Sequence, residues 1–252
     1  MIVTTSWDDG SVHDEKIAAL LAKYGLKGTF YVPFAAPHGV MRPTQLRDLA
    51  AHFEIGGHTM THLNLTKAPA RTAREEIAAS KRRIEDTTGR GCDMFCFPKG
   101  HFRREHLAML RDAGFLGART VELLSLGFAR PRSGIAVMPT TIQAFSHSWM
   151  AYARNAVKRH SAASLPALVT AFRQRNWTTI ARSLFQRCLR QGGVFHLWGH
   201  SWEIEEQGAW GPLEELMAYL SEWRGRAIFL NNAEACQYAV FTRGNLPAAV
   251  MS

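Results

Sequence analysis

The chain has 252 residues, 46% of them hydrophobic and 20% charged, which is the composition of a globular protein with one sizeable core. Its formal net charge of +9 would suit a phosphate-rich partner, but no recognised nucleic-acid-binding motif accompanies the basic residues, so we expect no nucleic-acid partner. We find neither an apolar run of the roughly 18 residues that a membrane span needs nor a secretory signal, and we therefore expect a cytoplasmic protein without a membrane span.

Strand and helix patterns alternate over about the first 120 residues, with short joints between them. Apolar or β-branched runs predict strands at Met1–Ser6, Thr29–Val32, Phe53–Gly57, Asp93–Phe97 and Phe115–Val121. Apolar residues at helical spacing predict helices at Asp14–Tyr24, Pro43–His52, Ala70–Thr88 and Arg103–Ala113. Strands that alternate with helices in this way imply an α/β fold with a parallel sheet, and repeated units of this kind can close into a barrel.

The pattern weakens beyond Arg130. Ser146–Arg190 is predicted to be largely helical and carries much of the basic excess, before Val194–Trp198 returns to strand. No stretch has the composition of a linker, so residues 1–252 are predicted to form a single domain. The four cysteines lack the spacing of structural zinc sites and are predicted to be reduced thiols.

Residues that can bind a metal follow two of the predicted strands. Asp9 comes at the end of the first strand, next to Asp8 and Gly10, and His58 and His62 follow the strand that ends at position 57. The carboxyl ends of parallel strands meet at the edge where barrels place their active sites, so we expect these side chains to lie together. One aspartate and two histidines provide three ligands for Zn²⁺ or another first-row ion such as Co²⁺, and leave room for water. A spacing of four within one helical turn would place both histidines on the same face.

A second aspartate and a late histidine are candidates for proton transfer. A hydrolytic water needs a base, and Thr59 occupies the position of the glutamate base in HExxH metalloproteases, which leaves Asp8 as the candidate. The acid for the leaving group is either His196 or His200. His196 lies within a strand, which favours a buried core histidine, whereas His200 follows Gly199 at the strand end, so we favour His200.

These sequences resemble the ordered motifs of the polysaccharide deacetylase (NodB-homology) family of carbohydrate esterases. The matching sequences are Ser6-Trp7-Asp8-Asp9-Gly10, His58-Thr59-Met60-Thr61-His62, Phe95-Cys96-Phe97-Pro98-Lys99-Gly100 and the strand that leads to His200. The resemblance covers about residues 2–205 and implies a distorted (β/α) barrel of the polysaccharide deacetylase type, here with a helical insertion near residues 146–190. It implies Asp8 as the catalytic base, His200 as the acid, and Asp9, His58 and His62 as the metal ligands.

Two departures from the family pattern concern the surroundings of the base and the acid. Cys96 stands where the family often has an arginine that orients the base, and because a thiol cannot supply a guanidinium, Arg119 becomes the candidate for orienting Asp8. There is no clear match to the family motif whose tryptophan and aspartate tune the acid histidine, and residues 118–122 occupy that region. The fold and the metal site therefore transfer from the family more directly than the substrate does.

The sequence predicts a metal-dependent hydrolase, with Zn²⁺ as the expected cofactor, that removes acetyl groups from an N- or O-acetylated sugar or glycan precursor. The lack of a signal favours a small or lipid-carrier-linked (glycolipid-linked) carbohydrate substrate. Trp198, Trp202 and Trp210 are candidates for stacking on sugar rings, although ordinary packing is the better explanation for at least two of the three. Two alternatives stay open: an amide or cyclic imide hydrolase of the same fold acting on a small metabolite, and a non-catalytic glycan- or phosphate-binding protein that uses the basic helices.

Overall fold

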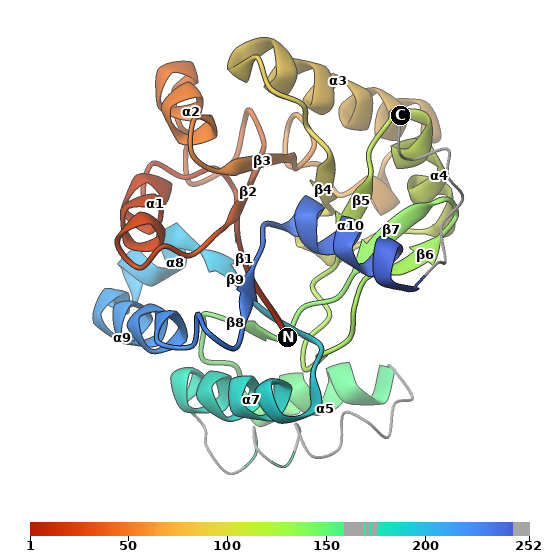
Figure 1. Ribbon diagram of the computed structural model, residues 1–252. Helices are drawn as coiled ribbons and strands as arrows, with labels where there is room; N and C mark the ends of the chain where they lie inside the picture. The colour runs from red at the N-terminus through yellow and green to blue at the C-terminus, as the bar shows by residue number, and fades with distance from the viewer. Residues whose placement is uncertain (159–168, 170–171, 173–175, 244–252) are drawn as a thin grey trace.

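The protein forms a curled sheet with helices packed around its outside (Figure 1). The computed structural model describes residues 1–158, 169, 172 and 176–243. The strands are β1 (Ile2–Asp8), β2 (Thr29–Val32), β3 (Glu54–Gly57), β4 (Met94–Cys96), β5 (Gly117–Arg119), β6 (Arg130–Arg132), β7 (Ile135–Met138), β8 (Ile142–Gln143), β9 (Val194–His200) and β10 (Ile228–Phe229). The helices are α1 (Asp14–Lys23), α2 (Pro43–Ala50), α3 (Ala70–Thr88), α4 (Arg104–Asp112), α5 (Trp149–Lys158), α7 (Trp177–Gln191), α8 (Ser201–Glu206), α9 (Trp210–Ser221) and α10 (Asn232–Arg243).

The sheet order is β6-β7-β5-β4-β3-β2-β1-β9-β8, and β10 pairs with β1. Among the described residues, every neighbouring pair of strands is parallel except β6 and β7. The predicted α/β fold, a distorted (β/α) barrel, is therefore confirmed. Within the part of the chain that the structure describes, no helix has the length and apolar character needed to cross a membrane.

The structure contains strands that the sequence did not predict: β6, β7, β8 and β10. β6 reads Arg-Pro-Arg and is exposed throughout, and β8 and β10 have 2 residues each, so these three lack a recognisable apolar pattern. The predicted helical insertion near residues 146–190 is present at its two ends as α5 and α7. Residues 159–168, 170–171 and 173–175 between these helices lie outside the described part of the chain.

Alternate side chains of each strand face two different surroundings, because successive residues of a strand point to opposite faces. On β1, Trp7 faces the surrounding helices and belongs to the larger apolar core. Ile2 instead packs with Tyr31 of β2 in a second, smaller core on the inner side of the sheet. Ser6 and Asp8 share the parity of Ile2, so the inner face becomes polar toward the carboxyl end of β1.

Helix α10 lies against the amino ends of β1, β2 and β3 (Figure 1). The Asn232 side chain accepts a hydrogen bond from Thr4 at 2.8 Å and donates one to the hydroxyl of Tyr31 at 2.8 Å. Glu54 accepts hydrogen bonds from the backbone N–H groups of residues 232 and 233, at 3.0 and 3.2 Å. A carboxylate in this position satisfies otherwise unpaired helix N–H groups and interacts favourably with the helix dipole. These bonds fix α10 at the edge of the sheet opposite to the candidate chemical residues.

Strand register brings those chemical residues to a common level. Asp8 is the register partner of His200 on β9, and Cys96 is the register partner of Arg119 on β5. His58 follows β3 directly. All of them lie at the carboxyl edge of the parallel strands, where the sequence pattern predicts the site.

Gly56 of β3 leaves space for the ring of Tyr31, and we expect Gly56→Ala to destabilise the fold. An added Cβ would lie 2.6 Å from the Tyr31 ring and 2.8 Å from the carbonyl oxygen of Met94. We expect a loss of about 1–3 kcal/mol in the free energy of unfolding, measured by urea denaturation. Gly225→Ala is the matched control, because nothing lies within 4 Å of a Cβ added there. Equal stability of the two variants would contradict the steric argument.

Candidate active site

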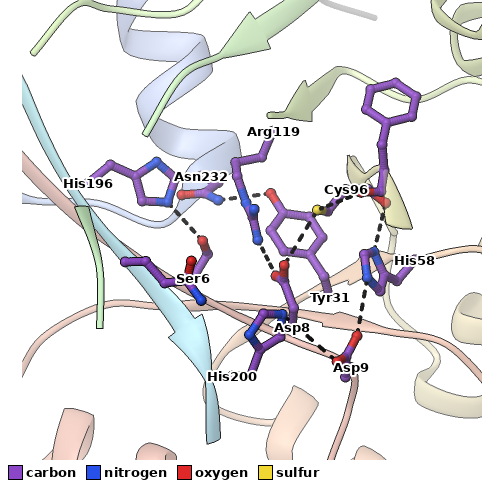
Figure 2. Close-up of polar contacts among 12 residues, drawn as sticks. Ser6, Asp8, Asp9, Tyr31, His58, Cys96, Arg119, His196, His200 and Asn232 are labelled. Carbon is purple, nitrogen blue, oxygen red and sulfur yellow. Dashed lines mark hydrogen bonds and ion pairs between the residues drawn. The ribbon is translucent and has the colours of Figure 1, made fainter. Parts of the chain in front are cut away.

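Asp9 faces His58 at the carboxyl ends of β1 and β3 (Figure 2), and it also faces His62 in the loop that follows β3. Its Oδ1 lies 3.4 Å from Nε2 of His58 and 3.2 Å from Nε2 of His62. Nδ1 of His58 donates a hydrogen bond of 2.8 Å to the backbone carbonyl of Cys96. This bond orients the imidazole and directs Nε2, the nitrogen that can bind a metal, toward Asp9. The predicted juxtaposition of Asp9, His58 and His62 is therefore present.

The two histidines meet through a loop and not through the helical turn that their spacing suggested. Residues 58–64 contain no helix, and the backbone has positive φ at Thr59 (60°) and His62 (54°). Such φ values are uncommon for residues other than glycine and cluster at functional sites, where the surrounding structure must stabilise them. Glu76 of α3 provides that support, because its Oε2 accepts the backbone N–H groups of Met60 and Thr61 at 2.8 and 3.0 Å.

This cluster fits a divalent metal ion. Asp9 Oδ1 is buried and has no hydrogen-bond partner among the described residues. Ligand atoms bound at about 2.0–2.2 Å with tetrahedral angles lie roughly 3.3–3.6 Å apart, which is close to the observed 3.2 and 3.4 Å. Burial alone would raise the pKa of Asp9, but the imidazoles of His58 and His62 outweigh burial and keep that pKa well below its usual range. Asp9 is therefore in the carboxylate form that a metal ion requires.

The other oxygen of Asp9 is bound by a tryptophan. Trp202 of α8 donates its indole N–H to Oδ2 of Asp9 at 3.0 Å, and its ring stacks on His38 at a centroid distance of 3.7 Å. The sequence suggested Trp202 only as a residue for sugar stacking or packing. A hydrogen bond to the carboxylate of a metal ligand orients that ligand, so Trp202 supports the cluster of Asp9, His58 and His62.

Asp8 is oriented by Arg119, as the departure at position 96 suggested. Arg119 is fully buried, and its Nη2 donates a hydrogen bond to Oδ1 of Asp8 (Figure 2). The thiol of Cys96 lies 3.7 Å from Oδ2 of Asp8, and because burial raises the pKa of that thiol, Cys96 remains a protonated donor. Cys96 on β4 and Arg119 on β5 are register partners, so the guanidinium reaches Asp8 from β5 at the same level of the sheet as the Cys96 thiol.

The guanidinium of Arg119 lies between two aromatic rings. Its Cζ is 5.1 Å from the centroid of Tyr31 and 4.7 Å from that of Trp198. Nε and Nη1 of Arg119 have no hydrogen-bond partner among the described residues. Cation–π contacts of this kind are strongest when the cation is desolvated, and here they partly replace the missing hydrogen bonds. Trp198 thus contributes to the site through Arg119, while Trp210 donates to Glu205 near the surface.

A second group of potential ligands, Asp8, His58 and Cys96, also lies within 4.8 Å of one another. This group is the poorer metal site. Asp8 already binds Arg119, and burial raises the pKa of the Cys96 thiol, whereas a metal requires the thiolate. The cluster of Asp9, His58 and His62 is therefore the candidate metal site.

His200 lies at the end of β9 with Nε2 directed at the Asp9 carboxylate, 3.9 Å from its Oδ2. Nδ1 of His200 forms a hydrogen bond of 2.7 Å with Glu203, which also accepts a hydrogen bond of 2.9 Å from Gln143. Burial alone would lower the pKa of His200, but Glu203 and the charges of Asp8 and Asp9 raise it above its ordinary value. Sequence reasoning did not identify Glu203. The only signal was an acidic residue three positions after a histidine at the start of a helix.

His196, the other candidate acid, is buried in the core, as its position within a strand predicted. It is 1% exposed, its Nε2 is 2.8 Å from the hydroxyl of Ser6, and its Nδ1 is 3.2 Å from the carbonyl of Pro139. Burial lowers the pKa of His196 to about 3, so this histidine is neutral. The structure brings His200, and not His196, to the group formed by Asp8 and Asp9.

A cavity of about 590 Å³ opens onto this group of residues. Its lining includes both aspartates, His58, His62 and His200. The remaining lining residues come mainly from loops and from α5: Pro37, His38, Phe97, Lys99, Val121, Leu123, Gln143, His147, Ala151, Arg154, Trp198 and Trp202. The volume is within the range of small-molecule sites, so one or two sugar rings fit.

Comparison with known proteins points to one family. Residues 1–118 match the family model described as "Polysaccharide deacetylase". A curated relative, "Putative polysaccharide deacetylase YxkH" of Bacillus subtilis (strain 168), is 26% identical over 125 residues, which make up 48% of this chain and 44% of that protein. The matched region thus spans less than half of that relative.

Solved structures show the same fold. A "putative polysaccharide deacetylase" from Mycobacterium smegmatis superposes with a TM-score of 0.71 at 15% identity, covering 97% of this chain and 92% of that one. A mutant of BA3943, a CE4 family pseudoenzyme with restored enzymatic activity, gives a TM-score of 0.53 at 18% identity and covers 93% of this chain and 67% of that one. At these identities the likeness concerns the fold alone.

We expect Arg119→Met to lower the free energy of unfolding by about 3–5 kcal/mol, because removing one partner of a buried ion pair leaves the other charge uncompensated. In the double variant Asp8→Asn/Arg119→Met no buried charge is left at the pair, so the loss should be smaller than in Arg119→Met alone. Urea denaturation of the wild type, Asp8→Asn, Arg119→Met and the double variant measures the coupling energy between the two side chains. A double variant less stable than Arg119→Met would contradict the pairing.

We expect acid to destabilise the protein partly through His196. Its pKa is about 3 in the folded protein against 6.5 as the ordinary value, so the unfolded state binds the extra proton between these pH values. Stability should therefore fall as the pH drops below about 6.5, by up to about 1.4 kcal/mol per pH unit from this residue. Urea denaturation between about pH 7 and pH 5 should give a shallower slope for His196→Gln than for the wild type. His52→Gln, at an exposed position, is the control and should keep the wild-type slope.

Proposed function

The chain belongs to the polysaccharide deacetylase family, and on that premise we propose that it is a metal-dependent hydrolase which removes acetyl groups from an N- or O-acetylated sugar or glycan precursor. One observation carries the proposal: the buried Oδ1 of Asp9 faces Nε2 of both His58 and His62, while the adjacent Asp8 binds Arg119. Two neighbouring carboxylates thus have separate environments, one suited to a metal and one to proton transfer.

Asp9, His58 and His62 are the proposed ligands of Zn²⁺ or another first-row ion such as Co²⁺. When bound, such an ion lowers the pKa of a water molecule and polarises a carbonyl oxygen. The chain orients these ligands in advance, because the carbonyl of Cys96 binds His58 and the indole of Trp202 binds Asp9. Preorganised ligands of this kind raise metal affinity.

Asp8 is the proposed general base. Arg119 binds Oδ1 of Asp8 from the inner face of the sheet and fixes the direction of the carboxylate, which lines the cavity. In this position Asp8 can take a proton from the water that attacks the acetyl carbonyl. The turn of Phe97–Gly100 follows β4 at the edge of the same cavity, and a backbone N–H from this turn is the proposed donor to the developing oxyanion.

His200 is the proposed general acid. Glu203 binds Nδ1 of His200, so Nε2 carries the exchangeable proton toward the cavity. The raised pKa of His200 keeps that proton in place near neutral pH until the leaving amine or alcohol accepts it. Asp8 and His200 are register partners on neighbouring strands, and this arrangement supports the proposal that they act as base and acid on one substrate.

We expect the Asp9→Ala variant to lose both bound metal and acetate release, and the Asp8→Asn variant to keep the metal while acetate release falls at least 100-fold. Metal content of the purified protein and acetate release from a panel of N- and O-acetylated sugars and glycans measure the two effects. Asp48→Asn is the matched control, since Asp48 is an exposed residue of α2.

Each outcome separates one part of the proposal from the rest. Full metal occupancy in Asp9→Ala would overturn the ligand assignment. Unchanged acetate release in Asp8→Asn would overturn the assignment of the base. Hydrolysis of a small amide or cyclic imide without acetate among the products would support an amide hydrolase of the same fold instead. Binding of glycans that is unaffected by a chelator, with no product formed, would support a non-catalytic protein.

A further inference from the structure

We propose that the cavity binds its acetylated sugar through an anionic group, a phosphate or a carboxylate, which Lys99 and Arg154 recognise. The proposal rests on the proposed deacetylase function and names the class of substrate for it. Lys99 and Arg154 line the same cavity as Asp8, Asp9 and His200, and their side chains take no part in the chemistry described above.

Lys99 reaches the cavity from a constrained turn. It lies between Pro98 and Gly100, in the 3₁₀ segment that joins β4 to α4, and its backbone has a φ of 59°. A positive φ costs a residue with a Cβ on the order of 1 kcal/mol, and glycine would adopt it without that cost. The turn therefore constrains the backbone of Lys99, and the exposed side chain of this residue lines the cavity.

Arg154 reaches the cavity from α5, the first helix of the segment predicted as an insertion. The buried Tyr152 anchors α5, and Ala151 and Arg154 of this helix line the cavity. Arg154 itself is exposed. The cavity thus has one cation from the loop after β4 and one from α5, two segments far apart in the sequence.

Neither cation has a carboxylate partner within 4.0 Å among the described residues, in contrast to Lys16 and Lys23, which pair with glutamates. The acidic residues that line the cavity are Asp8 and Asp9, and both are engaged, Asp8 by Arg119 and Asp9 by the histidines and Trp202. The positive charge of Lys99 and Arg154 is therefore uncompensated, and it faces the space where a substrate must enter.

His147, which also lines the wall, does not supply this charge. Burial lowers the pKa of His147, and its Nε2 lies 2.8 Å from Oε1 of Gln143, so this residue is a neutral part of the wall. The wall also contains the apolar side chains of Phe97, Val121 and Leu123. Such a wall can accommodate an acetyl group and the face of a sugar ring, while a guanidinium and an ammonium suit the oxygens of a phosphate or carboxylate.

The experiment measures kcat/KM and KM for acetate release from three matched monosaccharides: N-acetylglucosamine 1-phosphate, an N-acetylated amino-uronic acid and neutral N-acetylglucosamine. The wild type should prefer one of the two anionic substrates at least 10-fold. Lys99→Gln and Arg154→Gln should each raise KM for that substrate about 10-fold, with kcat and the neutral substrate changed less than about 2-fold. Lys99→Arg should retain most of the preference, since it keeps the charge.

Arg190→Gln is the matched control, because it removes one charge from the last turn of α7, just before β9 and so at the opposite edge of the sheet from His200. Equal effects of Arg190→Gln and Lys99→Gln, or equal effects on the neutral and anionic substrates, would overturn the proposal. If Lys99→Gln and Arg154→Gln lose only a preference for the phosphorylated sugar, the anionic group of the substrate is a phosphate. If they lose only a preference for the uronic acid, that group is a carboxylate. Both results support the subsite.

Failure of the deacetylase function is distinguishable from failure of the subsite. If no acetate is released from any substrate, calorimetric titration of the metal-loaded protein with the same three compounds decides the subsite alone. About 10-fold weaker binding of an anionic compound to Lys99→Gln, with unchanged binding of the neutral one, would support the subsite without the activity. Equal affinities in the wild type and both variants would overturn it.

Discussion

The buried ion pair of Asp8 and Arg119 is the interaction on which the site depends. Arg119 is 0% exposed, so its charge must be compensated inside the protein, and Asp8 with the rings of Tyr31 and Trp198 provides that compensation. The pair joins β1 to β5, strands separated in the sheet by β2, β3 and β4. The curl of the sheet is what brings them together, and therefore the orientation of Asp8 is a property of the whole barrel.

Two adjacent aspartates acquire different surroundings because the chain changes direction between them. Asp8 is the last residue of β1 and faces the inner side of the sheet, whereas Asp9 has a φ of 76° and turns toward the loop of His58 and His62. Uncommon backbone geometry occurs in three separate loops, with positive φ at Asp9, Thr59, His62 and Lys99. All of these residues except Thr59 line the cavity. The barrel core and contacts such as that of Glu76 stabilise this geometry, so the ligands are oriented at the expense of local backbone energy.

The sequence predicted the features that depend on local pattern. Alternating strands and helices predict the fold, and short motifs after strands predict that Asp8, Asp9, His58, His62 and His200 lie together, because parallel strands bring their carboxyl ends to one edge. Contacts between distant positions follow from register and curl, which no local pattern contains. Arg119 could be suggested only because Cys96 left a guanidinium missing, and the bond of Trp202 to Asp9 spans 193 positions. β8, with 2 residues, is defined by its neighbours alone.

A fold and its chemistry can separate, as BA3943 illustrates, a CE4 family pseudoenzyme of which a mutant has restored enzymatic activity. The strand ends that carry Asp8, Asp9 and His200 are fixed by sheet register, while the wall of the cavity comes from the turn at Lys99 and from α5. Loops and inserted helices tolerate change that strand register does not. The cavity wall can therefore vary without disturbing the ion pair of Asp8 and Arg119, and for this reason motif resemblance supports the proposed reaction more directly than it supports a particular substrate.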